Sequence, residues 1–312
     1  MMILTRTPLR ISFVGGGSDR PWFYQEEPGA CVAAAIDKYV YVALNPKYDG
    51  SIRAAYSVTE NVTTLDHLEH ELIREALRLT GRTHSIEVHS IADIPGGTGL
   101  GSSSSFTVGL LNALYEAYPR KTEHLAHTAC TIELDICQKP IGKQDQYTAA
   151  YGGINLLGFT SQGVSVEPIA CDLDALSAHC LLLDTGMVRN GDAGQHLDSQ
   201  THDRDDVRLL ASMATVFAAA LAADDLQECG EIMNAAWLTK SKFIASRWLD
   251  AKMEAAEAAG AWGGKLCGAG GGGFLLFLAP PERHAAIISA LGLRHVPIRV
   301  GVGGSEVVWQ GR

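Results

Sequence analysis

The sequence predicts a two-lobed protein of mixed helix and strand, and three observations lead to that prediction. At 312 residues and 33.3 kDa the chain is long for one hydrophobic core and long enough for two packed lobes. Hydrophobic residues make up 46% and charged residues 19%, the composition of an ordinary globular protein. Segments with strand and helix periodicity alternate along the chain, without a repeat or a low-complexity stretch. We place residues 1–170 in an N-terminal lobe and residues 171–312 in a C-terminal lobe.

The elements follow from periodicity and from chain-breaking residues. Residues 31–46 are β-rich in their second half and end at Pro46, which cannot donate to a β-ladder. Residues 85–94 alternate as a strand and run into Pro95, whereas residues 158–176 form the most loop-like stretch of the middle. Three helices are expected from apolar residues at helical spacing: Leu68, Leu72, Ala76 and Leu79; Phe106, Leu110, Ala113, Leu114 and Ala117; and Leu125, Ala129, Ile132 and Ile136.

Charge and cysteine content argue against several classes of protein. Lys and Arg number 25 against 35 Asp and Glu, a net charge of -10, so we expect neither nucleic acid nor an anionic membrane as a partner. The seven cysteines include no C-x-x-C pair, and their odd number argues against a disulfide framework and for a reducing cytoplasm. The N-terminus lacks the layout of a signal peptide, and no apolar stretch is long enough for a membrane span. We therefore expect a cytoplasmic protein, and the sequence leaves a homo-oligomer open.

The stretch PGGTGLGSSSS, residues 95–105, places four glycines and four serines between a predicted strand and a predicted helix. Free backbone N–H groups and the positive end of the helix dipole favour an anion at such a helix start. Glycines let the backbone approach a phosphate closely, and serine hydroxyls can contact its oxygens or a metal. The plain alternative is a tight turn with a serine N-cap, and a short glycine motif does not decide between the two. No Gly-Lys-Ser/Thr closes the stretch, so it is not a Walker A motif.

Two further glycine clusters change that balance. GKLCGAGGGGFLLFLAP, residues 264–280, places glycines just before an apolar strand, where the alternative is a bulged hairpin. TPLRISFVGGGSDRP, residues 7–21, holds a third cluster directly after a strand, with Arg10 and Asp19 beside it. So many glycines indicate backbone packed against a ligand or another loop.

The three clusters, in this order, resemble the motifs of the GHMP kinases, the superfamily of galactokinase, homoserine kinase, mevalonate kinase and phosphomevalonate kinase. PLRISFVGGGSD matches the first motif, PGGTGLGSSSS the phosphate-binding second motif and GAGGGGF the third. The resemblance spans essentially the whole chain. It implies an α+β fold of two lobes, with an N-terminal lobe like domain 2 of ribosomal protein S5 and a ferredoxin-like C-terminal lobe. It also implies an ATP-dependent kinase that uses Mg²⁺ and acts on a small sugar or sugar phosphate.

Two carboxylates are candidates for phosphoryl-transfer chemistry. Glu133 lies on or beside a buried helical stripe, where a carboxylate needs a partner. An ion pair with Lys139 or Lys143 would supply one, whereas the resemblance implies a Mg²⁺ ligand that acts together with Ser103 or its neighbour Ser102. Asp145 begins a short helical pattern, where an acidic residue complements the helix dipole.

The context of Asp145 matches the catalytic aspartate of the family, and Arg10 then occupies the position of the neighbouring cation. Whether Asp145 is the base or an electrostatic orienter stays open. The resemblance assigns the following residues to ATP: Pro95, Gly96, Gly97, Gly99, Leu100, Gly101, Ser102, Ser103 and Ser104. It assigns these to the substrate: Gly16, Gly17, Ser18, Asp19, Arg20, Gly152, Gly153, Arg189 and Gly271.

The wider pattern is similar to that of the D-glycero-D-manno-heptose 7-phosphate kinases, which implies phosphorylation of an anomeric oxygen to give a 1,7-bisphosphate. Gly16 and Gly17 stand where galactokinases carry a Glu-His pair, which argues against galactose. Cations near the motifs are candidates for the phosphate of the substrate: Arg20, Arg53, Lys143 and Arg189.

Three alternatives remain. They are a kinase of a free fucose-like or mannose-like sugar, a ligand sensor without turnover on the same fold, and a nicotinamide-dependent oxidoreductase that only the glycines would suggest. The chain after Gly15 fits the last of these poorly. The 11 histidines form no metal-binding motif, so we expect them to be structural or solvated.

Overall fold

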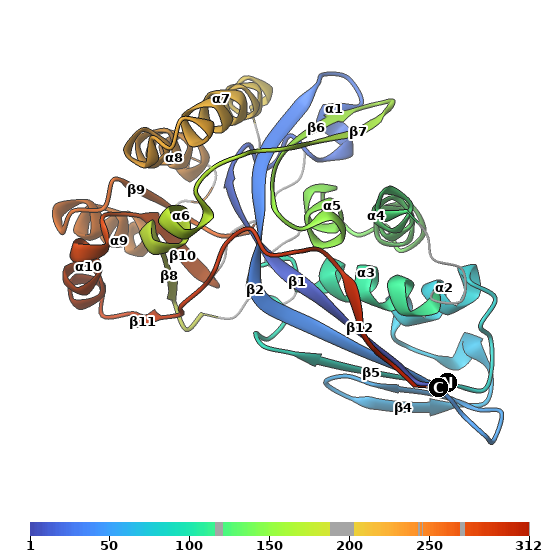
Figure 1. Cartoon of the computed structure of the whole chain (residues 1–312). Coiled ribbons are helices and arrows are strands. Elements are labelled where there is room, and N and C mark those ends of the chain that lie inside the picture. The colour runs from blue at the N-terminus through green and yellow to red at the C-terminus, as the bar shows by residue number, and fades with distance from the viewer. Residues whose placement is uncertain (116–120, 188–202, 243, 245, 269–271, 312) are drawn as a thin grey trace.

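Two β-sheets organise the molecule, which we describe from a computed structural model (Figure 1). The structure describes residues 1–115, 121–187, 203–242, 244, 246–268 and 272–311. One sheet belongs mainly to the N-terminal half of the chain and the other to the C-terminal half. This arrangement confirms the expected α+β fold of two lobes.

The first sheet has eight strands. They are β1 (Ile3–Val14), β2 (Gly29–Pro46), β3 (Ile52–Ala55), β4 (Thr59–Val62), β5 (Ile86–Ala92), β6 (Ile154–Thr160), β7 (Gly163–Pro168) and β12 (Glu306–Gln310). The order is β12-β1-β2-β5-β3-β4, and β6 pairs with β2 and β7. β2 is long enough to pair with β1 along one edge while its other edge pairs first with β6 and then with β5. β3 and β5 are parallel, and the other pairs are antiparallel.

Burial along β1 shows where the second lobe meets the first sheet. Its first four residues alternate between buried and half-buried, as expected for a sheet with one covered face, and from Thr7 onward every residue is buried. Helix α7 (Arg204–Ala222) packs on this part of the sheet, and Phe13 stacks on Phe217 with ring centroids 5.1 Å apart. Arg10 therefore lies in the doubly covered half of β1.

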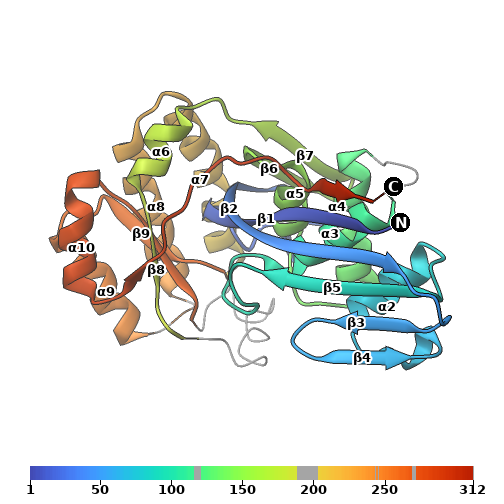
Figure 2. The ribbon, with the colours of Figure 1, turned by 60° about the horizontal axis from the view of Figure 1, so that its bottom comes forward.

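Four helices cover the other face of the first sheet, as Figure 2 shows. They are α2 (Glu71–Leu79), α3 (Ser102–Leu114), α4 (Thr122–Cys130) and α5 (Gln144–Tyr151). α3 is central and almost entirely buried, which confirms the predicted apolar stripe up to Leu114, while Ala117 lies outside the described residues. Leu79 and Ile136 were predicted to lie in buried stripes and are instead exposed, because each sits where its helix ends.

The predicted helix around Glu133 is not regular. α4 ends at Cys130 and continues as a wide π-turn, η2 (Thr131–Ile136). π-turns are rare and are often found at functional sites. The two short 3-10 turns are η1 (Leu65–His67) and η3 (Pro281–Arg283).

The second sheet has four antiparallel strands in the order β11-β8-β10-β9. They are β8 (Cys180–Asp184), β9 (Gly263–Leu266), β10 (Phe274–Leu278) and β11 (Arg294–His295). The remaining helices are α1 (Pro21–Tyr24), α6 (Leu173–His179), α8 (Leu226–Ser241), α9 (Arg247–Ala258) and α10 (His284–Leu291). Helices α7 and α8 share one hydrophobic core with β1 and β2, so apolar packing runs from one lobe into the other.

Two segments differ from the sequence prediction. The stretch expected to be a loop, residues 158–176, contains the end of β6, the exposed strand β7 and the start of α6. β7 was not predicted because an exposed edge strand needs few apolar residues. The last strand, β12, pairs with β1 of the first sheet, so both chain termini lie together (Figure 1). The lobe boundary near residue 170 stays a prediction.

All seven cysteines are free thiols, as expected from their scatter. Within the described part of the chain, no helix is long and apolar enough to cross a membrane.

Candidate active site

A pocket of about 290 Å³ lies between the two lobes. The N-terminal half contributes the loop after β1, the loop that leads into α3, and the segment that leads into α5. The C-terminal half contributes Leu210 of α7, Lys240 of α8, Lys265 of β9 and Gly268. All three glycine clusters of the sequence therefore reach one cavity.

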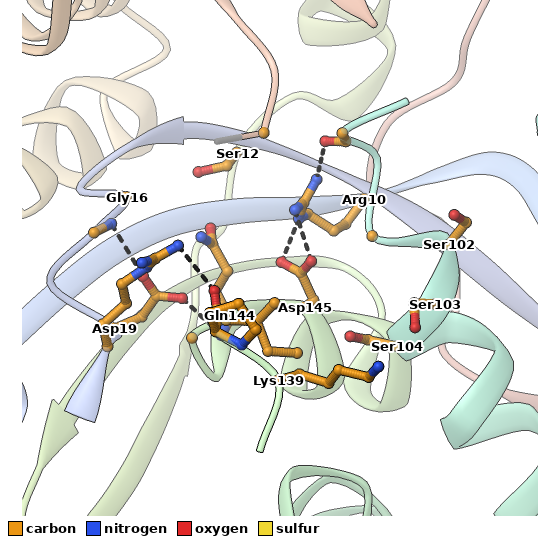
Figure 3. A pocket seen from close by; sticks show the side chains of 18 of the residues that line it. Arg10, Ser12, Gly16, Asp19, Ser102, Ser103, Ser104, Lys139, Gln144 and Asp145 are labelled. Atoms are coloured by element: carbon orange, nitrogen blue, oxygen red, sulfur yellow. Dashed lines mark hydrogen bonds and ion pairs between the residues drawn. The ribbon is translucent and has the colours of Figure 1, made fainter. Parts of the chain in front are cut away.

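Arg10 and Asp145 form an ion pair at the centre of this pocket (Figure 3). Arg10 Nε donates to Asp145 Oδ1 and Arg10 Nη2 to Asp145 Oδ2, each at 2.7 Å, while Nη1 donates to the Gly99 carbonyl at 2.6 Å. A two-pronged pair of this kind fixes both side chains in orientation as well as distance. Burial lowers the pKa of Arg10, and the charge and hydrogen bonds of Asp145 raise it by more, so the guanidinium stays charged. β1 supplies the cation, and the first turn of α5 supplies the carboxylate.

The glycine-rich loop 95–101 turns the chain sharply into α3. Gly97, Gly99 and Gly101 have φ angles of 79°, 81° and 75°, a region that glycine adopts without strain. Gly101 is the N-cap of α3, and Ser102, Ser103 and Ser104 follow in its first turn. These glycines and serines line the pocket, so backbone N–H groups and hydroxyls surround one end of it.

Three residues predicted to bind ATP are not part of the pocket lining. Leu100 is fully buried and its carbonyl accepts the Arg10 N–H at 3.0 Å, so it anchors the loop to β1. Pro95 and Gly96 lie at the exposed start of the loop, where the Pro95 carbonyl accepts the Thr98 hydroxyl at 3.0 Å.

The third glycine cluster packs directly on this loop. A Cβ at Gly99 would lie 2.6 Å from the Cys267 carbonyl oxygen, and one at Gly268 would lie 2.6 Å from the Gly99 Cα. Two backbones can approach so closely only without side chains. The glycines of the third cluster that the structure describes thus hold the second cluster in place.

Glu133 lies behind the serines and is fully buried. Its carboxylate accepts hydrogen bonds from Ser104 at 2.7 Å, from Thr107 at 2.8 Å and from the Gln146 amide. Ser103 Oγ is 3.4 Å from Glu133 Oε1, which is long for a hydroxyl donor. Burial raises the pKa of Glu133, and the three stronger hydrogen bonds oppose that rise.

The ion pair of Glu133 with Lys139 or Lys143 does not form. Lys139 pairs with Glu71, and the Lys143 ammonium lies over the Tyr24 ring, 4.4 Å from its centroid. Hydroxyl and amide donors satisfy the buried carboxylate in place of a cation.

The first cluster lines the end of the pocket opposite the serines, where Figure 3 places Gly16 and Asp19. Asp19 is 3% exposed, and its carboxylate accepts the Gly17 N–H at 3.0 Å and the Gln144 N–H at 3.3 Å. Arg20 lines the pocket and donates to the Pro140 carbonyl at 3.0 Å. Ser18 turns away from the pocket, is fully buried and bonds the carbonyls of Gly15 and Ala30, so it shapes the loop.

Of the remaining predicted substrate residues, Gly152 and Gly153 are not part of the pocket lining. Gly152 and Gly153 form a turn with φ angles of 69° and 68° against the chain near Gly303, where Gly153 N–H donates to Val302 at 2.7 Å. Their glycine character is explained by that close approach, because a Cβ at Gly152 would lie 2.1 Å from the Gly304 nitrogen. Arg189 and Gly271 lie outside the described residues.

Sequence reasoning missed several side chains that line the pocket: Ser12, Lys139, Gln144, Lys240 and Lys265. Lys265 left one sign in the sequence, a single charge inside a run of glycines and apolar residues that forms a buried strand. Of the cations predicted to meet a substrate phosphate, Arg53 is on β3 and pairs with Glu87 of the neighbouring strand, away from the pocket lining.

Comparisons with known proteins agree with this arrangement. Residues 67–153 match the N-terminal domain of GHMP kinases and residues 217–295 match the C-terminal domain. The chain is 29% identical over 314 residues to the D-glycero-alpha-D-manno-heptose 7-phosphate kinase of Campylobacter jejuni, with 93% of each chain covered. It is 24% identical to a galactokinase of Pyrococcus furiosus, over 93% of this chain and 92% of that one.

Solved structures show the same fold. A D-glycero-D-manno-heptose 1-phosphate kinase from Bacteroides thetaiotaomicron superposes with a TM-score of 0.83 at 25% identity and covers all of both chains. A galactokinase of Lactococcus lactis, solved with galactose, has a TM-score of 0.78 at 16% identity over 98% of this chain and 95% of its own.

Proposed function

We propose that this chain, which belongs to the GHMP kinase family and is a sugar or sugar-phosphate kinase, transfers the γ-phosphoryl group of ATP to the anomeric oxygen of a sugar phosphate. The acceptor we propose is D-glycero-D-manno-heptose 7-phosphate, which would give the 1,7-bisphosphate. The observation that carries the proposal is the Arg10–Asp145 pair, which lies between a phosphate-type loop and the Asp19 end of one pocket. Phosphoryl transfer requires the donor phosphate, the reacting centre and the acceptor to lie in line, and the loop, the ion pair and the Asp19 end follow that order.

The loop 97–104 would hold the phosphates of ATP. Its positive φ glycines present backbone N–H groups, and the N-terminus of α3 adds the positive end of a helix dipole. In a protein with a net charge of -10, such local donors are needed to hold a polyanion.

The donor set near Ser103 fits a magnesium ion. Three hydrogen bonds fix the Glu133 carboxylate, and its Oε1 faces the pocket-lining Ser103 hydroxyl across 3.4 Å. Mg²⁺ prefers oxygen ligands and keeps several waters, so one carboxylate and one hydroxyl suffice from the protein. Ser103 and Glu133 would hold the ion, which when bound neutralises charge on the phosphates.

Arg10 and Asp145 would act on the reacting atoms. Asp145 can accept the proton of the acceptor hydroxyl or orient that hydroxyl for attack. Arg10, held by Asp145 and the Gly99 carbonyl, presents a fixed cation where negative charge develops. Asp19 at the other end can accept hydrogen bonds from sugar hydroxyls.

The choice of a heptose phosphate rests on the relative with that activity and on the excess of cations in the pocket. The test is kcat/KM for D-glycero-D-manno-heptose 7-phosphate beside mannose, fucose and galactose, with phosphorus spectra to locate the new phosphate. We expect the heptose phosphate to be preferred by at least about 100-fold, because polar groups built for a ligand are left unsatisfied without it. A free hexose that equals it would reject this acceptor and favour a free-sugar kinase, whereas no ADP release with any acceptor would favour a sensor.

A further inference from the structure

Lys265 is a buried cation on the wall of the pocket. It is the third residue of β9 and is 5% exposed. Strand alternation places the next residue, Leu266, in the apolar core between the second sheet and its outer helices, so Lys265 faces the opposite way, toward the first lobe. Both the main pocket and a small cavity behind Gly16 are lined by Lys265.

Among the described residues, no side chain or carbonyl pairs with the Lys265 ammonium. The buried carboxylate of Asp19 is near enough to act on it electrostatically but forms no ion pair with it. Burial lowers the pKa of Lys265 to about 8, so it is still mostly protonated at neutral pH. An unpaired buried cation opposes folding, so its presence in a pocket indicates an anionic ligand that completes the site.

The pocket wall around Lys265 carries an excess of positive charge. Lys240 also lines both cavities, and its ammonium donates at 2.8 Å to the carbonyl of Gly268, the residue that packs on Gly99. Lys240 therefore lies on the side of Lys265 that is nearer to the phosphate loop. Arg20 is a third cation of the pocket wall, and Asp19 is the carboxylate nearest to Gly16 in that wall. The serine loop lies at the other end, beyond the Arg10–Asp145 pair (Figure 3). An anion held beside Gly16 would therefore be separate from the phosphates held by the serine loop.

We propose that Lys265 and Lys240 form the binding site for the acceptor's own phosphate group, and that they make the enzyme select a sugar phosphate over the free sugar. The proposal rests on the proposed function, because it presumes a phosphorylated acceptor. It differs from the cations chosen from sequence, since both lysines come from the C-terminal half of the chain. Asp145 lines the same pocket, so an acceptor whose phosphate is held there can reach Asp145 with its other end.

The test compares Lys265→Met with the wild type on two acceptors, D-glycero-D-manno-heptose 7-phosphate and the same heptose without phosphate. We expect kcat/KM for the phosphorylated acceptor to fall by at least about 100-fold, mainly through KM. Activity on the free heptose and KM for ATP should stay within about threefold. Lys240→Met should show the same pattern with a smaller loss. Lys242→Met is the matched control, because Lys242 is exposed and pairs with Asp206.

Equal losses on both acceptors, or a KM for ATP that rises as steeply as that for the acceptor, would overturn the proposal. Lys265 would then act on the transferred phosphoryl group or on the fold. The melting temperature of ligand-free Lys265→Met is measured first, and a value no lower than that of the wild type shows that this variant folds. If Lys265→Met does not fold, the two acceptors are compared with Lys240→Met instead. If the wild type itself shows no preference for the phosphorylated acceptor, the proposed substrate fails. If the wild type prefers it and both variants keep that preference, only the present inference fails.

Discussion

Asp145 is bound to Arg10 by two hydrogen bonds, and this pair gives the first prediction at the scale of single residues. In Asp145→Asn the amide can accept only one of those bonds and cannot take a proton. We expect kcat to fall by about 10²- to 10⁴-fold, the usual contribution of a positioned acid–base group, with little change in ATP affinity. The measurement is steady-state kinetics together with ATP binding by calorimetry.

The control for that variant is Asp135→Asn, which removes an exposed carboxylate of the nearby π-turn. Because Arg10 is 5% exposed and loses a charged partner, Asp145→Asn should also melt at a lower temperature. Wild-type turnover in Asp145→Asn would remove Asp145 from the mechanism.

Glu133 is held by three donors, so its neutral isostere should fold. In Glu133→Gln the amide oxygen can take the place of only one carboxylate oxygen, because Thr107 donates to Oε1 whereas Ser104 and Gln146 donate to Oε2. With the oxygen facing Thr107, the new N–H groups can donate to the Ser104 hydroxyl and to the Gln146 Oε1, which has no partner and can be turned toward them. An amide is a poorer ligand than a carboxylate for a hard cation. We expect a nearly unchanged melting temperature and a Mg²⁺ requirement raised by about tenfold or more, measured as activity against free Mg²⁺. An unchanged Mg²⁺ dependence would make Glu133 purely structural.

The pKa of Lys265 makes the stability of the ligand-free protein depend on pH. Burial lowers this pKa from 10.5 to about 8, and burial raises the pKa values of the neighbouring thiols Cys31 and Cys267. The other charged groups that act on Lys265 are Arg10 and Asp19. Below pH 8 both the folded and the unfolded chain carry the Lys265 proton, and the folded state bears the full cost of the buried charge. That cost, about 3 kcal/mol, fades as pH rises from 8 to 10.5.

Lys265→Met should therefore be more stable than the wild type at pH 7, and the difference should shrink toward pH 10. Methionine fills a similar volume without the charge, so the comparison isolates the ammonium. Denaturant unfolding of both proteins at pH 7, 8.5 and 10 provides the measurement. A variant that is less stable at pH 7 would mean that the fold already pairs Lys265.

At the scale of elements, the contact between two glycine-rich loops decides the shape of the phosphate end. Gly99 has φ 81° and a Cβ there would collide with the Cys267 carbonyl, whereas Gly50 has φ 78° and open space around it. Alanine at Gly50 should cost only the left-handed backbone penalty, about 1 to 2 kcal/mol. Alanine at Gly99 adds a backbone collision, so we expect a larger loss of stability and a KM for ATP raised by about tenfold or more.

Gly50→Ala is thus the matched control for Gly99→Ala, with nearly the same φ and no neighbour. Equal losses of stability in the two variants, with no change in KM for ATP, would show that the loops separate without consequence. The comparison is made by denaturant unfolding and by ATP kinetics of both variants.

At the scale of the whole molecule, the C-terminal strand closes the first sheet. β12 pairs with β1 from Ile3 to Arg6, and Arg6 Nε donates to the Glu306 carboxylate at 3.1 Å. Deletion of residues 306–312 would leave β1 as an unpaired edge. Since each ladder hydrogen bond contributes about 1 kcal/mol, we expect a loss of about 2 to 4 kcal/mol in unfolding free energy and a tendency to aggregate.

The deletion should leave kinetics per folded molecule within about twofold, because β12 contributes no described residue to the pocket lining. Removal of residues 311–312 alone serves as the control. Unchanged stability after the longer deletion would show that β12 is dispensable.

The sequence by itself determined the features that depend on a few consecutive residues. The three glycine clusters, the serine-rich start of α3 and the apolar stripes of the buried helices can all be read within one or two turns, because backbone preference and burial periodicity are local. The motifs also identified Arg10, Asp19, Glu133 and Asp145, which the structure places in or directly behind one pocket. Where an element was missed, as with β7, the pattern was too short to decide, because only Val164 and Val166 alternate with exposed residues there.

Only the tertiary structure decided which of these residues meet. Arg10 and Asp145 are 135 residues apart, and their pairing depends on how α5 packs against β1. Lys265 lines the pocket because β9 lies at the edge of a second sheet that faces the first lobe. Gly152 is not part of the pocket lining, because it pairs with Gly303 of the C-terminal segment that returns to the first sheet. Such contacts depend on the packing of many distant segments at once, and no local preference of the chain encodes them.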